Sequence, residues 1–251
     1  MDYKKLMDLY LAKYTCNQVD YGTVSDFADS RINLPEVCGL NGDLKNSQRA
    51  WMIKAILGNV PVGSNILEIG AGEPIVANIL TNLGYHVTIV DPYDGSGNGP
   101  THYEIYKKEY PQINIIREYF DENLSTLPKK SFDAIYSISV LEHVPADKVV
   151  DLAKTTALFL KDGGNNIHAI DHVFRGAGQE FHEAQLDNYF KGFGIKETSK
   201  PVLSLLKDDV ETYFMSAEGH LFWMGETSYN DFPFRKVVSI NLNISNKKDI
   251  G

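Results

Sequence analysis

The sequence predicts an α/β fold in which helices cover both faces of a mostly parallel sheet. Two observations predict it. From residue 65 onward, short apolar runs alternate with amphipathic stretches, which is the pattern of buried parallel strands joined by helices. The first apolar run opens onto two glycines, Gly70 and Gly72, where a strand passes into a helix. The 251 residues, 43% of them hydrophobic, suffice for one core of this kind.

Helices are predicted on both sides of the first strand. Leu6, Leu9 and Tyr10 recur at helical spacing within residues 2–14. Residues 15–42 are turn-rich, and a helix then runs from Asp43 to the region of Gly58 and Pro61. The later helices are expected at about 74–83, 101–109, 145–160 and 182–190.

Parallel strands are predicted at 65–69, 86–90, 113–116, 132–138 and 166–170. After Gly194 the pattern changes to short runs separated by turns. Residues 212–215 and 220–224 flank a turn and favour an antiparallel hairpin. The alternating residues 236–242 favour a final strand that completes the sheet edge.

The Gly-x-Gly turn carries the functional information. Glycines without a Cβ let the backbone turn tightly and approach a ligand. Asp91 ends the next apolar run about 20 residues later, the distance at which a strand-helix-strand unit brings an acid to a ribose diol. Dinucleotide sites have a third glycine, which is Ile75 here, so a nicotinamide-dependent oxidoreductase is disfavoured.

Three blocks of sequence resemble one known family. Residues 66–74, ILEIGAGEP, match its motif E/D-x-G-x-G, and Asp91 is the acid that ends the following strand. Residues 131–144, SFDAIYSISVLEHV, match its fourth-strand block. In this order, the blocks resemble class I S-adenosylmethionine-dependent methyltransferases. The resemblance implies a Rossmann-like, seven-stranded sheet, a helical cap at 1–60, a cofactor-binding domain at 61–245 and a polar tail at 246–251.

The resemblance also implies a set of cofactor-binding residues. Asp91 is expected to accept hydrogen bonds from both ribose hydroxyls, Glu68 to orient the amino group of the methionine moiety, and Tyr93 to cover the adenosine. The family's adenine-reading aspartate is missing, so adenine contacts are expected from the backbone near Tyr119 or from Asp121. The full cofactor set is Glu68, Gly70, Ala71, Gly72, Pro74, Asp91, Tyr93, Tyr119, Phe120 and Ser137.

The densest group of titratable residues follows the fifth strand. Histidine accepts protons near neutral pH, so we expect His172, assisted by Asp171, to deprotonate an acceptor hydroxyl, with His143 nearby. An ordinary hydrogen-bonding pair at 171–172 and a structural His143 are the alternatives. Arg175, His182 and Tyr21 are the expected substrate-binding residues, and Tyr21 would belong to the cap.

Metal chemistry remains an alternative in this region. Asp, His and Glu side chains could hold a divalent cation that positions two acceptor oxygens, although no fixed spacing indicates such a site. The two cysteines, Cys16 and Cys38, have neither C-x-x-C spacing nor the number needed for a disulfide framework.

Composition and charge limit the classes of partner that the protein can bind. A net charge of −9 without a basic cluster disfavours nucleic acid. No apolar run approaches the length of a membrane span, and the charged start lacks a signal region. We therefore expect a cytoplasmic monomer or homodimer that methylates a hydroxyl of a small polar metabolite, such as a sugar or sugar nucleotide. An N-methyltransferase and a non-catalytic S-adenosylmethionine-binding protein remain alternatives.

Overall fold

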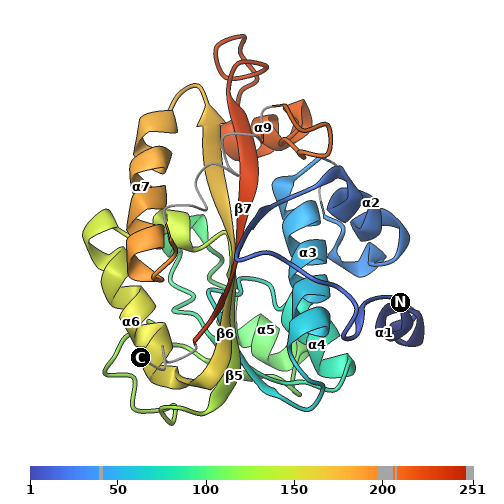
Figure 1. Cartoon of the computed structure of the whole chain (residues 1–251), viewed down its shortest axis with the longest axis vertical. Helices are drawn as coiled ribbons and strands as arrows, with labels where there is room; N and C mark the ends of the chain where they lie inside the picture. Colours follow the sequence, from blue (N-terminus) through green and yellow to red (C-terminus); the bar gives the residue numbers. More distant parts are fainter. Residues whose placement is uncertain (40–41, 197–205, 207, 247–251) are drawn as a thin grey trace.

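A seven-stranded sheet forms the centre of the molecule (Figure 1). The computed structural model describes residues 1–39, 42–196, 206 and 208–246. The strand order is β1-β7-β6-β5-β2-β3-β4. The strands are β1 (Val19–Tyr21), β2 (Asn65–Ile69), β3 (His86–Val90), β4 (Asn114–Ile116), β5 (Phe132–Ile138), β6 (Leu160–Arg175) and β7 (Lys236–Ser245). β7 pairs antiparallel with β1 and β6, and the remaining pairs are parallel, which confirms the predicted fold class.

Helices cover both faces of this sheet. In the view of Figure 1, α6 and α7 lie on one side of the strands and α2, α3 and α4 on the other. The helices are α1 (Tyr3–Tyr10), α2 (Val24–Ile32), α3 (Leu44–Asn59), α4 (Ile75–Asn82), α5 (Tyr103–Glu109), α6 (Val149–Phe159), α7 (Gln179–Gly192) and α9 (Ala217–Met224). Short 3₁₀ turns include η3 (Leu141–His143), directly after β5.

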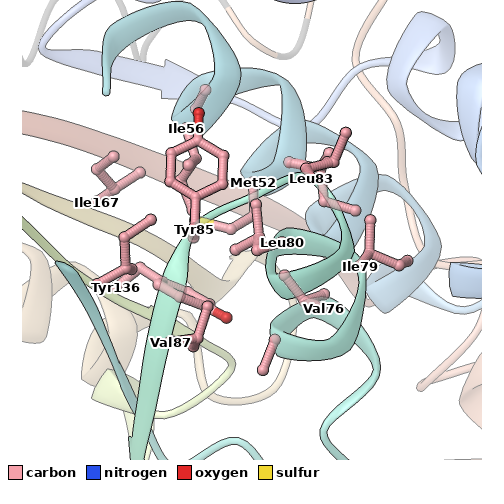
Figure 2. Close-up of a cluster of buried hydrophobic side chains, with 14 of the residues drawn as sticks. Met52, Ile56, Val76, Ile79, Leu80, Leu83, Tyr85, Val87, Tyr136 and Ile167 are labelled. Carbon is pink, nitrogen blue, oxygen red and sulfur yellow. The ribbon is translucent and has the colours of Figure 1, made fainter. Parts of the chain in front are cut away.

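The largest core cluster lies between the sheet and helices α3 and α4 (Figure 2). Met52 and Ile56 of α3 meet Leu80 of α4 around the ring of Tyr85, whose hydroxyl donates to the carbonyl of Val60 at 2.9 Å. Burying a side chain of this size contributes roughly 1.5–3 kcal/mol. This packing fixes β2 and α4, and hence the turn between them.

A capping box and a buried ion pair place helix α2. Thr23 and Asp26 form a capping box at the start of α2, in which each side chain accepts the other's backbone N–H. Lys54 of α3 is buried and pairs with Asp26 at 2.7 Å and with Asp29 at 2.6 Å. The buried ion pair joins α2 to α3. Because α3 packs on the sheet, the pair holds α2 in the helical layer on that face.

The prediction of β2, β3 and β5 was accurate to the residue, and β6 extends beyond the predicted 166–170. Residues 15–42, interpreted as turns, contain β1 and α2. β1 is an edge strand of the sheet and pairs with β7 from the other end of the chain. The short, weakly apolar β1 gave no strand pattern, because its position depends on pairing with a distant segment.

The predicted hairpin over 212–224 is wrong, because residues 212–215 contribute only an isolated bridge between Thr212 and Thr23. Residues 217–224 form α9, which Ser216 caps by accepting the N–H of Gly219 at 3.2 Å. A short continuous apolar run is compatible with either a strand or a buried helix. The N-cap at Ser216 accounts for the helix, and in the part of the C-terminal region that the structure describes the antiparallel strand is β7.

Candidate active site

The Gly-x-Gly turn joins β2 to α4, and both glycines have left-handed backbone conformations. Gly70 has a φ of +65° and Gly72 a φ of +57°, a region that side chains disfavour. A Cβ at Gly70 would lie 2.7 Å from Val140, so protein occupies that space. A Cβ at Gly72 would meet only Pro100, at 3.6 Å. Gly72 is therefore the glycine that leaves room for a ligand. Ala71 lies between the two glycines, and Pro74 occupies the N-cap position of α4.

Asp91, at the end of β3, is held by the same turn. Its Oδ2 accepts the N–H of Gly72 at 3.0 Å, and its Oδ1 accepts the N–H of Tyr93 at 2.8 Å. Each carboxylate oxygen has two lone pairs, so one remains on each for a further donor. Burial raises the pKa of Asp91, and the two backbone N–H groups oppose that shift. The side chain is thus oriented for a ligand with two adjacent hydroxyls.

Tyr93 stabilises the turn that holds Asp91. Its hydroxyl donates to the carbonyl of Gly72 at 2.9 Å, while its ring packs against Tyr103 and Tyr106 of α5. Tyr93 is only 1% exposed and has a φ of +48°. A residue held in this sparsely populated region marks a backbone fixed by its surroundings. Tyr93 therefore stabilises the turn through its hydroxyl, from a buried position.

Glu68 lies on β2 below the turn and is buried. Its Oε2 accepts the hydroxyl of Tyr136 on β5 at 2.7 Å. Burial raises the pKa of Glu68 to about 8, and the Tyr136 hydrogen bond limits the rise. Glu68 therefore carries a proton at pH 7, although a cation brought near it would favour the carboxylate.

A cavity of about 380 Å³ is formed by the segment that follows β4. It is lined by Glu118, Tyr119, Asp121, Asn123 and Leu124. The Tyr119 hydroxyl donates to Asp94 at 2.5 Å, which lowers the pKa of Asp94 to about 2. This hydrogen bond joins the cavity to the loop that follows Asp91. Phe120 instead packs against Phe159 of α6.

A second polar group lies where β5 and β6 end. Ser139 donates its hydroxyl toward Gln48 of α3 and Asp171 of β6, both at 2.8 Å. The amide nitrogen of Gln48 also donates to Asp171 at 2.8 Å. Ser139 has a φ of +51°, a conformation that costs about 1–3 kcal/mol in a residue with a side chain. The network joins three elements around one carboxylate.

Glu142 and His143 extend this group in η3. The carboxyl oxygens of Glu142 are buried without a hydrogen-bond partner, and burial raises its pKa well above the usual value. His143 Nε2 lies 3.9 Å from Glu142 Oε1. The His143 side chain is 45% exposed, and burial of the remainder lowers its pKa, so the ring is neutral at pH 7. His143 can therefore accept a proton from a ligand.

The predicted pairing of His172 with Asp171 is wrong in geometry. Successive side chains of a strand point to opposite faces of the sheet. Asp171 meets Gln48 on the α3 side, whereas His172 packs against His182 of α7 with ring centroids 5.8 Å apart. His172 is buried, and burial followed by the charge of His182 lowers its pKa to about 4. Asp171 thus does not assist His172.

Three further predicted residues lie apart from both groups. Ser137 is fully buried and its hydroxyl is bonded to His168 Nδ1 at 2.9 Å. Arg175, at the exposed end of β6, lies over the ring of Phe234 at 5.5 Å. Tyr21 lies on the edge strand β1 and donates its hydroxyl to Asp209.

Sequence reasoning missed Gln48 and Ser139. Gln48 belongs to Asn46-Ser47-Gln48, a polar run that is completely buried in the first turns of α3. Its position before a long apolar stretch resembles an ordinary polar helix start, and only packing reveals its burial. Ser139 has a positive φ, and a serine in the sequence does not predict that conformation.

Among the residues that the structure describes, no three or more His, Cys, Asp or Glu side chains are grouped so as to hold a metal ion. Within the same residues, none of the helices combines the length and apolar character that crossing a membrane requires.

Comparison with known proteins identifies the family. A family model described as a methyltransferase domain matches residues 47–199, which include the Gly-x-Gly turn, Asp91 and the Ser139 network. The chain belongs to this methyltransferase family. The match confirms the predicted class I S-adenosylmethionine-dependent methyltransferase and its cofactor. No curated protein matches the sequence.

One solved structure that shares the fold of this methyltransferase is that of an N-methyltransferase. Haemonchus contortus phospholethanolamine N-methyltransferase 2, in complex with phosphomonomethylethanolamine and S-adenosylhomocysteine, aligns with a TM-score of 0.52 and 14% identity over 88% of this chain. The chain spans 59% of that protein's length. A TehB-like S-adenosylmethionine-dependent methyltransferase from Corynebacterium glutamicum aligns at a TM-score of 0.44 and 19% identity, over 67% of this chain and 81% of its own.

Proposed function

We propose that this protein transfers a methyl group from S-adenosylmethionine to a small polar acceptor that binds beside Ser139, Asp171 and His143. One observation carries the proposal. Asp91 is fixed by the N–H groups of Gly72 and Tyr93 with a lone pair free on each oxygen. A cis diol is the chemical group that matches this pair of acceptors, and the ribose of the cofactor provides one.

The surrounding residues suit the rest of the cofactor. The open Cβ position of Gly72 admits the methionine moiety against the backbone. Glu68, neutral in the free protein, would become a carboxylate on approach of the ammonium group. The cavity at Tyr119 and Asp121 is adjacent to Asp91 through Asp94 and has room for the adenine ring. When bound, S-adenosylmethionine supplies a methyl group made electrophilic by its positively charged sulfur.

The acceptor would be oriented by the Ser139 network. Methyl transfer is an in-line displacement, so alignment of the acceptor accounts for much of the rate. A hydroxyl acceptor, such as that of a sugar or sugar nucleotide, also has to lose its proton. His143 is neutral at pH 7 and partly exposed at this edge, which makes it a better base than the buried His172. A small acceptor in the cytoplasm is part of the same proposal.

An amine is the second candidate acceptor. Asp171 accepts hydrogen bonds from two neutral donors, Gln48 and Ser139, and its negative charge interacts with the more distant Arg235. A cationic acceptor would find compensation for its charge there. An amine needs less assistance in losing its proton than a hydroxyl does, so His143 would matter less for N-methylation.

Calorimetric titration with S-adenosylhomocysteine tests the cofactor site. We expect micromolar binding and no binding of NAD, and folded protein that binds neither would overturn the proposal. Incubation with methyl-labelled S-adenosylmethionine and pooled polar metabolites, followed by mass spectrometry of the labelled product, then distinguishes oxygen from nitrogen methylation. Tight cofactor binding without transfer to any fraction would instead support a non-catalytic binding protein.

A further inference from the structure

Six large apolar side chains are exposed on α9 and in the loop that follows it. They are Leu221, Phe222, Trp223, Met224, Tyr229 and Phe234, and we call this surface the α9 platform. Phe222, for example, is 62% exposed. Phe222 contacts Trp223 and Tyr229 contacts Phe234, with ring centroids 4.8 and 4.7 Å apart, and exposed apolar groups of this kind mark binding surfaces.

The exposure follows from how α9 is built. Ser216 caps its start, and Gly225, with a φ of +74°, ends it after eight residues. His220 and Gly219 face inward and are buried, while the four apolar residues that follow occupy consecutive positions. Consecutive positions on a helix point in different directions, so α9 cannot bury them all against the sheet.

Cations surround the α9 platform. Lys45 lies 4.8 Å from the ring of Trp223, and Arg175 lies 5.5 Å from that of Phe234. Lys236 lies over Phe232 at 5.2 Å. The nearby acids are Glu218, Glu226 and Asp231. The surface therefore carries both signs of charge, with Lys45 and Arg175 lying beside its apolar rings.

The α9 platform adjoins the proposed acceptor site. Lys45, under Trp223, lies one helical turn before Gln48 on α3, and residues three apart share a helix face. Gln48 in turn bonds to Asp171. The charge of Lys45 also acts on the nearby His143, where it opposes the effect of Asp171. Figure 1 shows α9 at the same end of the molecule as the first turn of α3.

We propose that the α9 platform binds the apolar portion of the acceptor, so that the substrate of this enzyme is an anionic amphiphile rather than a wholly polar metabolite. The inference rests on the proposed function, because it takes the Ser139 network as the acceptor site. An apolar tail would lie on Phe222 and Trp223, and an anionic group near Lys45 would direct the remaining polar group toward Asp171.

Tryptophan fluorescence provides a local measurement. The chain has two tryptophans, of which Trp51 is completely buried and Trp223 is exposed. We expect decyl phosphate, used below its micelle concentration, to shift the emission of Trp223 to shorter wavelength in a saturable manner. Decyltrimethylammonium of equal chain length should bind at least about tenfold more weakly, because its charge matches that of Lys45, and equal binding of the two would overturn the proposed anionic character.

Two variants test whether decyl phosphate binds at the α9 platform. The double substitution Leu221→Ser, Phe222→Ser should weaken decyl phosphate binding about tenfold or more, since it removes two apolar contacts. Ile105→Ser, a half-exposed residue on α5, is the control and should leave binding unchanged. Equal binding by the double variant and the control would overturn the proposal.

Other occupants give different results. Co-sedimentation with phosphatidylcholine–phosphatidylserine vesicles, without saturable binding of free decyl phosphate, would replace the amphiphile with a membrane surface. A concentration-dependent dimer that the double substitution abolishes would show that a second copy covers the platform. S-adenosylhomocysteine binding is measured on the same samples: its absence would overturn the proposed function, whereas its presence without a Trp223 shift would overturn only this inference.

Discussion

The backbone N–H of Gly72 donates to the carboxylate of Asp91 at 3.0 Å, across nineteen residues of sequence. The bond joins the two parts of the predicted cofactor motif directly. With the N–H of Tyr93 on the other oxygen, it sets the orientation of the carboxylate before any ligand arrives. Such preorganisation lowers the entropy lost on binding.

Asp91→Ala should abolish most cofactor affinity. The change removes two charge-assisted hydrogen bonds to the ribose hydroxyls, so we expect S-adenosylhomocysteine to bind about 100-fold more weakly in calorimetry. Asp151→Asn, which replaces an exposed acid on α6, is the control and should bind normally. Unchanged affinity in a folded Asp91→Ala protein would show that Asp91 does not contact the ribose.

Cofactor affinity should rise with pH because of Glu68. Its pKa of about 8 means that the free protein holds the proton at pH 6–8, whereas binding of an ammonium group favours the carboxylate and releases it. The affinity for S-adenosylhomocysteine should therefore increase by up to about tenfold per pH unit between pH 6 and 8 and then level off. Calorimetry in buffers of different ionisation enthalpy measures the released proton directly.

Two variants test that assignment. Glu68→Gln cannot ionise and should flatten the pH profile. Tyr136→Phe removes the hydrogen bond that limits the pKa of Glu68, so it should move the rise in affinity to higher pH. A pH-dependent rise that persists in Glu68→Gln would assign the proton to another group.

His143 and His172 should differ in their effects on methyl transfer. For a hydroxyl acceptor, His143→Gln should lower kcat about 10²-fold with cofactor binding intact, because it removes the base. The pKa of His143 lies below its usual value, so the ring is neutral above pH 6.5. Wild-type kcat should therefore increase with pH across the acid range and stay level from pH 7 upward.

The matched substitution His172→Gln should leave kcat nearly unchanged and lower only the thermal stability, because His172 is buried against His182. A large loss of kcat in His172→Gln alone would restore His172 as the base. Equal activity of both variants would favour an amine acceptor.

Lys54→Met should destabilise the fold by about 3 kcal/mol. The substitution leaves the buried carboxylate of Asp26 and that of Asp29 without their cation. Lys161→Met provides the contrast, because its pair with Asp133 is partly exposed and contributes about 0–1 kcal/mol. Urea unfolding measures both, and equal midpoints would show that the α2–α3 ion pair adds no stability.

Local patterns were sufficient for the central strands. β2, β3 and β5 are continuous apolar runs bounded by turn residues, and their limits were predicted to the residue because both faces of these strands are buried. The same regularity placed the Gly72 turn and Asp91 at the strand ends. The C-terminal region lacks such runs, so residues 220–224 were assigned to a strand although a serine cap makes them helical.

The sequence alone determined β2, β3, the turn at Gly72 and the acid at Asp91, because each depends on contacts within one strand-helix-strand unit. Tertiary structure decided which polar side chains meet. It separated His172 from Asp171 through the alternation of strand faces and joined Asp171 to Gln48 and Ser139 instead. Those contacts link α3, β5 and β6, and their formation depends on how the layers pack.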